Sequence, residues 1–117
     1  MTDNKLRFSI IITAYNIEDY IRRAIESALN QTYKNFEVIV INDASTDNTL
    51  EVIKGFEGIT IIDNKINCGL GASRNKCIRA ARGEYIIHLD GDDMMYNEEV
   101  LSDIDKLIGE ENYDIVF

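Results

Sequence analysis

Short apolar runs alternate with segments of helical periodicity along this chain. The runs Phe8–Thr13, Phe36–Asn42 and Glu84–Leu89 are rich in the β-branched and aromatic residues that favour strands. Residues 59–63 form a fourth run of the same kind. Because their apolar residues are nearly continuous, the strands are expected to be covered on both faces. The pattern predicts an α/β fold with a mostly parallel sheet flanked by helices on both faces.

Four segments between and after the apolar runs are predicted to be helical. The first follows Asn16, a candidate helix cap, and has apolar residues at three-and-four spacing as far as residue 31. A short helix is expected at about Leu50–Lys54. The next spans Ser73–Arg82 and is stopped by Gly83. A final helix is predicted over residues 97–109.

Length and charge narrow the class of protein. The 117 residues, 45% of them hydrophobic, fit one domain over residues 1–117. The 12 Lys and Arg residues against 21 Asp and Glu give a net charge of −9, which argues against nucleic acid and membrane surfaces as partners. No stretch has the roughly 18 to 20 apolar residues of a membrane span, and no secretory signal opens the chain. A cytoplasmic location is therefore expected, with Cys68 and Cys77 as reduced, packed thiols.

The end of the sequence suggests that the protein continues. Residues 113–117 begin a fifth predicted strand that has no closing helix after it. We expect the chain to be the first half of something longer. Apolar surface and a strand edge near Ile115–Phe117 should then be exposed and favour self-association.

Polar residues gather directly after the predicted strands. The carboxyl ends of parallel strands share one rim of the sheet, and ligands bind there where the strand order reverses. The rim residues are Thr13, Ala14, Tyr15 and Asn16 after the first strand, Asn42, Asp43, Ala44 and Ser45 after the second, Arg74 beyond the third, and Asp90, Gly91, Asp92 and Asp93 after the fourth. The sequence therefore predicts one crevice formed by four strand ends.

The aspartate cluster at the fourth strand end suggests a metal site. Carboxylates one residue apart across a glycine, as in Asp90 and Asp92, can project toward a common point, and Mg²⁺ and Mn²⁺ prefer oxygen ligands. Mg²⁺ usually keeps few protein carboxylates and completes its shell with phosphate oxygens and water, so this sparse pair suggests a metal bound with a diphosphate. The alternative is that the acids cap a helix that begins near Asn97.

Three other rim residues each have a functional and a structural interpretation. Asp43 can accept a hydrogen bond from a base N–H, or it can cap the helix that follows it. Tyr15 can stack on a base, or it is a half-buried tyrosine at the rim. Arg74 can bind a phosphate through its planar guanidinium, or it forms a surface salt bridge.

Familiar nucleotide and catalytic motifs fit the sequence poorly. The glycines of a dinucleotide fingerprint belong directly after the first strand, where this chain has "TAYNIED", and no P-loop motif is present. A nicotinamide enzyme and a P-loop phosphohydrolase are therefore disfavoured. His88 lies inside an apolar run with no nucleophile motif around it, and it is interpreted as a core or rim residue.

Three stretches in order carry a resemblance to a known family. They are "SIIITAYN", "ALNQTYKNFEVIVINDASTDNT" and "NCGLGASRNKCIRAARGEYIIHLDGDD", and the match spans about Phe8 to Phe117. Together they resemble the inverting family-two glycosyltransferases of the GT-A fold. The resemblance implies a sheet order that begins 3-2-1-4 and an N-terminal half that binds a nucleotide-sugar, most often UDP-linked.

The resemblance also implies roles for individual residues. The implied nucleotide-binding residues are Thr13, Ala14, Tyr15, Asn16, Asp43, Arg74, Asp90 and Gly91, and the implied metal-binding residues are Asp92 and Asp90. Asp43 would accept the uracil N–H. Asp92 would be the direct metal ligand, Asp90 would lie nearer the ribose or a metal-bound water, and Asp93 would position the others. Many relatives have two acids where this chain has Asn42 and Asp43, a mild departure.

The implied reaction is inverting transfer from a UDP-sugar to a saccharide or lipid-linked acceptor hydroxyl, with Mn²⁺ or Mg²⁺ as cofactor. The general base is expected downstream, so no catalytic residue is assigned in this chain, and the 117 residues alone are expected to bind nucleotide and transfer little sugar. The full-length protein would act in the cytoplasm or at the cytoplasmic face of the membrane, in cell-wall or polysaccharide biosynthesis. A noncatalytic α/β binding module and a receiver-like domain are the alternatives.

Overall fold

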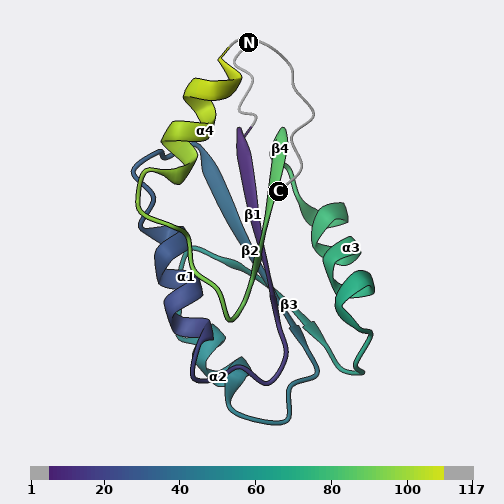
Figure 1. The fold of residues 1–117 in the computed structure, drawn as a ribbon. Helices are drawn as coiled ribbons and strands as arrows, with labels where there is room; N and C mark the ends of the chain where they lie inside the picture. Colours follow the sequence, from purple (N-terminus) through teal and green to yellow (C-terminus); the bar gives the residue numbers. More distant parts are fainter. Residues whose placement is uncertain (1–5, 110–117) are drawn as a thin grey trace.

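A computed structural model describes residues 6–109 of the chain, which form a parallel α/β sheet domain. The four strands in this part are β1 (Phe8–Ala14), β2 (Phe36–Asp43), β3 (Thr60–Asn64) and β4 (Tyr85–Asp90). They pair in the order β3-β2-β1-β4, and every pairing is parallel (Figure 1). The predicted fold class and the predicted start of the strand order, 3-2-1-4, are confirmed.

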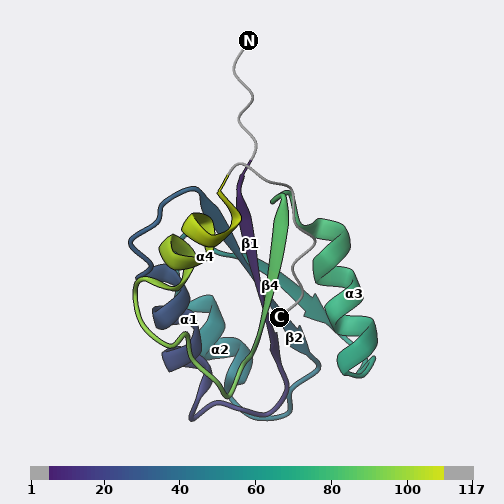
Figure 2. The same ribbon diagram turned by 45° about the horizontal axis from the view of Figure 1, so that its top comes forward.

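Helices cover both faces of this sheet. They are α1 (Ile21–Leu29), α2 (Thr49–Lys54), α3 (Leu70–Ala80) and α4 (Val100–Ile108). Figures 1 and 2 show α1, α2 and α4 on one face and α3 on the other. Within residues 6–109, no helix is both long enough and apolar enough to cross a bilayer.

The central strand β1 separates two hydrophobic cores. All seven of its residues are buried. Ile10 and Ile12 belong to the larger core, shared with α1, α2 and α4, while Ile11 joins Ile39 and Cys77 in a smaller core under α3. Because each buried Ile contributes about 1.5 to 3 kcal/mol, the strand is fixed strongly from both sides. The carboxyl-terminal end of β1, which includes Thr13, is therefore held in a fixed position.

Several predicted boundaries and environments were wrong in detail. Helix α1 begins at Ile21 rather than after Asn16, whose side-chain oxygen instead accepts a hydrogen bond from the Thr46 N–H at 2.7 Å. Helix α3 begins at Leu70 rather than Ser73, because Gly69 turns the chain into it with a φ of 86°. The prediction of a packed thiol holds for Cys77, whereas Cys68 is exposed in the loop before α3.

The predicted fifth strand at residues 113–117 lies outside the described residues, and so does the edge near Ile115–Phe117 on which the expected self-association depends.

Helix α3 ends at Ala80 with Ala81 extended, so Gly83 is not its stop signal. Gly83 instead lies against β1. Its N–H donates to Ser9 Oγ at 2.8 Å, and a Cβ there would lie 2.6 Å from backbone atoms of Phe8 and Ser9.

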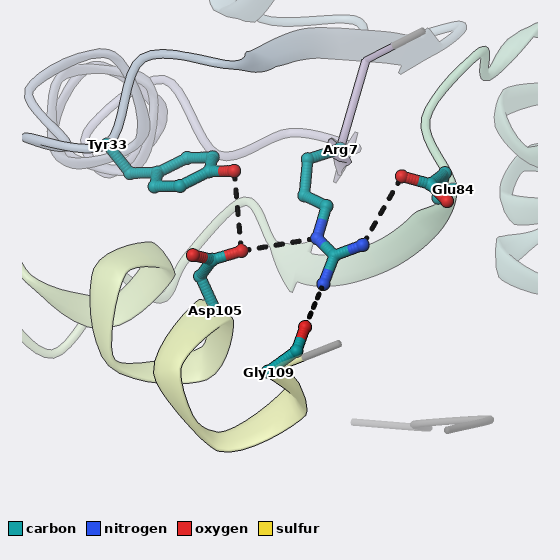
Figure 3. A network of polar contacts seen from close by, with 5 residues as sticks. All are labelled: Arg7, Tyr33, Glu84, Asp105 and Gly109. Carbon is teal, nitrogen blue, oxygen red and sulfur yellow. Dashed lines mark hydrogen bonds and ion pairs between the residues drawn. The ribbon is translucent and has the colours of Figure 1, made fainter. Parts of the chain in front are cut away.

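A polar network fastens α4 to the amino-terminal end of the sheet (Figure 3). The Arg7 guanidinium contacts Glu84 at 3.3 Å, Asp105 at 3.2 Å and the Gly109 carbonyl at 3.2 Å. The Tyr33 hydroxyl lies 3.4 Å from the same Asp105 carboxylate. Because one planar guanidinium joins β1, α4 and the start of β4, this end of the sheet is closed by protein groups. The opposite end, where the strands finish, remains available for a ligand.

We predict that Gly83→Ala lowers the free energy of unfolding by about 2 to 3 kcal/mol, since the new methyl group meets backbone that cannot move aside. The matched control is Gly71→Ala in the first turn of α3, where a Cβ meets nothing within 4 Å. There the change should be neutral or stabilising by up to about 1 kcal/mol. Urea unfolding measures both variants, and equal effects would contradict the prediction.

Candidate functional site

A pocket of about 430 Å³ lies at the carboxyl-terminal ends of the strands. Its lining residues come from three strand ends and from the start of α3. They are Thr13, Ala14, Tyr15, Ile17, Asp43, Asn67, Gly69, Leu70, Ser73, Asp90, Gly91 and Asp92. Seven of these, Thr13, Ala14, Tyr15, Asp43, Asp90, Gly91 and Asp92, were predicted from the sequence. The pocket confirms that separate strand ends meet in one crevice, although three strand ends and α3 line it instead of the predicted four strand ends.

The end of β1 supplies the wall of the pocket. Thr13 and Ala14 are buried, with 8% and 3% of their surface exposed, whereas the Tyr15 ring is half exposed at the rim. Asn16 does not line the pocket. Asn16 has a φ of 51°, and its hydrogen bonds with Ser45 and Thr46 join the loop after β1 to the loop after β2. The sequence thus identified Asn16 as a rim residue, but the structure gives it a scaffolding position.

Asp43 is the most strongly held polar group of the pocket. Only 5% of its surface is exposed, and its carboxylate accepts hydrogen bonds from the N–H groups of Cys68 and Gly69 at 2.8 and 2.9 Å and from the Asn64 amide at 3.0 Å. Burial raises the pKa of the Asp43 carboxyl, but these hydrogen bonds outweigh it and hold the pKa below its usual value. Asp43 is therefore an anion at neutral pH.

The alternative that Asp43 caps the next helix is wrong. The N-cap residue of α2 is Asn48, and the preceding Asp47 carboxylate accepts a hydrogen bond from the Thr49 N–H at 2.9 Å. Asp43 instead binds the loop before α3, on the far side of the pocket. That loop contributes two lining residues that sequence reasoning missed, Asn67 and Gly69, and α3 contributes two more, Leu70 and Ser73. Ile17, after β1, is the fifth lining residue that was missed. A glycine at a strand-to-helix junction was the available signal.

Three carboxylates lie at the mouth of the pocket. Asp90, Asp92 and Asp93 are exposed, and each offers an oxygen within 4.8 Å of the others. The Asp93 N–H donates to the Asp90 carbonyl at 2.9 Å, so a tight turn brings the side chains together. Helix α4 begins only at Val100, which shows that these acids do not cap it. Among the described residues this is the one cluster of three acidic, His or Cys side chains with the spacing of a metal site.

Gly91 makes this turn possible. Its N–H donates to the Thr13 carbonyl at 2.8 Å, and a Cβ would lie 2.6 Å from that oxygen and overlap the Ile17 side chain. Only glycine therefore lets the acidic turn pass this close to β1. The close approach brings Asp90 and Asp92 to the same pocket as Thr13.

Arg74 and His88 lie beside the pocket and do not line it. Arg74 is exposed on α3, and no salt bridge to it is present in the described part of the chain. The predicted alternative of a surface salt bridge is therefore not observed. His88 is a partly buried residue of β4, at 3.0 Å from Thr13 Oγ1 and 3.5 Å from Asp90 Oδ1.

Comparison with known proteins supports one family. The sequence profile of glycosyl transferase family 2 matches residues 9–117. The chain belongs to glycosyl transferase family 2. This assignment confirms the predicted family and excludes the receiver-like alternative.

Two curated relatives and one crystal structure indicate how much of such proteins the chain represents. The chain is 44% identical over 98 residues to the Escherichia coli UDP-Glc:alpha-D-GlcNAc-diphosphoundecaprenol beta-1,3-glucosyltransferase WfaP, covering 82% of this chain and 39% of WfaP. It is 38% identical over 103 residues to the poly(ribitol-phosphate) beta-glucosyltransferase of Bacillus spizizenii strain W23, covering 82% of this chain and 16% of that protein. The chain therefore spans less than half the length of either relative.

The structural comparison shows the fold. The crystal structure of S. aureus TarS residues 1–349 in complex with UDP-GlcNAc superposes with a TM-score of 0.83 at 33% identity, covering 90% of this chain and 32% of that one. Together with the sheet order β3-β2-β1-β4, this likeness assigns the GT-A fold to the described residues.

We predict that Asp43→Asn lowers the free energy of unfolding by about 1 to 3 kcal/mol at pH 7, because the amide places N–H donors against the donors of the α3 loop. The Asp43 pKa is lower in the folded than in the unfolded state, so its contribution is complete above pH ~4 and is lost as the pH falls through the folded pKa. The difference between wild type and variant should therefore shrink in acid.

Urea unfolding at pH 7 and at about pH 3 measures this difference. Asp103→Asn on the exposed face of α4 is the matched control and should change stability little at either pH. A difference between wild type and Asp43→Asn that does not depend on pH would show that the carboxylate is not the stabilising group.

Proposed function

We propose that this chain is the nucleotide-sugar-binding domain, over residues 1–117, of an inverting glycosyltransferase that takes a UDP-sugar with a divalent cation. One observation carries the proposal: a single pocket joins the buried Asp43 carboxylate to the exposed Asp90 and Asp92 carboxylates. A carboxylate that could accept a base N–H and carboxylates that could hold a cation thus line the same cavity. Its volume of about 430 Å³ falls in the range of small-molecule sites.

The buried end of the pocket suits a pyrimidine base. The Asp43 carboxylate accepts hydrogen bonds from four protein donors, the N–H groups of Cys68 and Gly69, the Asn64 amide and the Ser73 hydroxyl. Because a hydroxyl can rotate, an N–H of a ligand could take the place of the Ser73 hydroxyl. The half-exposed Tyr15 ring at the rim offers a flat face, and stacking of a base on an aromatic ring is worth about 1 to 3 kcal/mol. Together these groups would select a flat ring with a hydrogen-bond donor on its edge.

The exposed end of the pocket suits a diphosphate held through a cation. The three neighbouring carboxylates fit the hard oxygen ligands that Mn²⁺ and Mg²⁺ prefer, with Asp92 as the direct ligand, Asp90 nearer the ribose or a bound water, and Asp93 as a positioning group. When bound, such an ion stabilises negative charge on a departing phosphate. The carboxylates themselves would repel a diphosphate, so they bind it only when a cation neutralises them. Arg74 on α3 would add a positive charge near the base or phosphates.

The relatives support the class of donor and acceptor. TarS, at 33% identity, was crystallised with UDP-GlcNAc, and WfaP is named for a UDP-Glc donor and a diphosphoundecaprenol-linked acceptor. We therefore expect a saccharide or lipid-linked hydroxyl to attack the anomeric carbon opposite the leaving nucleoside diphosphate. The acceptor pocket and the general base are expected in the part of such proteins that this chain does not span. Action in the cytoplasm, or at the cytoplasmic face of a membrane, fits a lipid-linked acceptor.

We predict that the chain binds UDP in the presence of Mn²⁺, and that Asp92→Asn reduces this affinity at least tenfold, because one carboxylate ligand is lost. Asp43→Ala should also weaken UDP binding about tenfold or more, both with and without Mn²⁺, since it removes the acceptor at the base end. Isothermal titration calorimetry with UDP, in Mn²⁺ or in EDTA, separates the two effects.

Asp103→Asn makes the same acid-to-amide change on α4 and should leave UDP affinity unchanged. Circular dichroism of each variant confirms that it is folded. Equal UDP affinity in Mn²⁺ and EDTA would remove the proposed metal role, and no UDP binding by wild type would favour the noncatalytic binding module instead.

We also predict that the 117 residues bind donor without appreciable transfer to an acceptor. The reason is that general-base assistance, worth roughly 10²- to 10⁴-fold, is expected from residues outside this chain. Incubation with a radiolabelled UDP-sugar and a saccharide or lipid-linked acceptor measures the product, and robust transfer would overturn this expectation.

A further inference from the structure

His88 occupies a polar position that the proposed function does not use. It lies on β4 beside Ile11 of β1, on the face of the sheet that α3 covers, with 17% of its side chain exposed. It is the single histidine of the sequence. A polar ring this deep in an apolar strand needs a hydrogen-bond partner. Its partner is Thr13, and the carboxylate of Asp90 lies close to the same ring nitrogen.

One ring nitrogen of His88 meets two side chains. Nε2 lies 3.0 Å from Thr13 Oγ1 and 3.5 Å from Asp90 Oδ1. In the neutral ring, one nitrogen carries a proton and the other presents a lone pair. A lone pair on Nε2 would face the negative carboxylate of Asp90, whereas an Nε2–H would be attracted to it. The carboxylate therefore selects the tautomer with the proton on Nε2.

This tautomer fixes the direction of the Thr13 hydroxyl. If Nε2 donates to Thr13 Oγ1, the hydroxyl proton cannot point back at the ring and must find another acceptor. Within residues 6–109, the contact with His88 is the one hydrogen bond made by Thr13 Oγ1. Thr13 is 8% exposed, and it lines the pocket. The hydroxyl proton is thus free to point toward a ligand oxygen in the pocket.

We propose that His88 is a positioning residue of the site, whose Nε2–H is shared between Thr13 and Asp90 and turns the Thr13 hydroxyl into a donor toward the ligand. The oxygen that it recognises would be a carbonyl of the base or an oxygen of the ribose or phosphates. This inference rests on the proposed function for the identity of the ligand, but the tautomer itself does not depend on it.

The charged groups around His88 are consistent with a neutral ring. Burial lowers the pKa of His88 and the charge of Arg74 on α3 adds to this, while Asp90 opposes it, with a net pKa below the usual value. The inference does not depend on this shift, because a protonated ring also carries an N–H at Nε2.

Nitrogen NMR of the chain labelled with ¹⁵N-histidine tests the tautomer directly. Because there is one histidine, long-range proton–nitrogen correlation at about pH 8 yields a single ring pattern. We expect protonated Nε2 and unprotonated Nδ1. The opposite pattern would overturn the proposal, whatever the outcome of any binding experiment.

A double-mutant cycle tests the consequence for the ligand. His88→Phe and Thr13→Val should each weaken UDP binding in EDTA about three- to tenfold, the effect of one hydrogen bond, and the double variant should be no weaker than the weaker single variant. His88→Gln, which retains an N–H donor, should restore part of the affinity. Losses that multiply in the double variant would show that the two residues act separately and would overturn the proposal.

Tyr85→Phe removes a hydroxyl from the opposite end of the same strand and is the matched control. It should leave both the imidazole pattern and UDP affinity unchanged. Failure of wild type to bind UDP would refute the proposed function, while the imidazole pattern would still decide the inference about His88.

Discussion

The site depends on one buried carboxylate. Asp43 accepts hydrogen bonds from the N–H groups of Cys68 and Gly69 and from the amide of Asn64. The carboxylate thereby joins the end of β2 to the loop that enters α3, and that loop forms one side of the pocket. The hydrogen bonds keep the group ionised despite its burial, and an ionised group in turn holds the amides more firmly than a neutral one would. Local structure and binding chemistry therefore rest on the same charge.

The two ends of the sheet have opposite roles. At the amino-terminal end, Arg7 joins α4 to β1 and β4, and Gly83 packs directly on the β1 backbone, so protein groups satisfy one another there (Figure 3). At the carboxyl-terminal end, the polar groups of β1, β2 and β4 surround a cavity instead of closing it. Strand β1 runs between the two ends. It is buried along its whole length, and close packing holds it rigidly. The rigid strand explains how short turns can hold side chains in fixed positions.

The acidity of the chain makes tight binding of the proposed ligand depend on a cation. A net charge of −9 and three neighbouring carboxylates at the pocket mouth would repel a free diphosphate. A bound divalent ion reverses the local sign, so the cluster becomes a site whose affinity for anions is controlled by metal. His88 contacts both Asp90 and Thr13, so it links the acidic turn to the Thr13 hydroxyl on the pocket wall.

The sequence by itself determined the sheet, its strand order through the family resemblance, and most of the pocket. Continuous Ile and Val runs define strands covered on both faces, and the carboxyl ends of parallel strands must share one rim, so Thr13, Asp43 and Asp92 could be brought together without coordinates. Only the tertiary structure decided which partners the polar groups choose. Asn16 and Asp43 both have the side chains of helix caps, yet each binds a loop distant in the sequence. Hydrogen-bond partners depend on distances between segments far apart in the chain, and the local pattern of residues does not encode those distances.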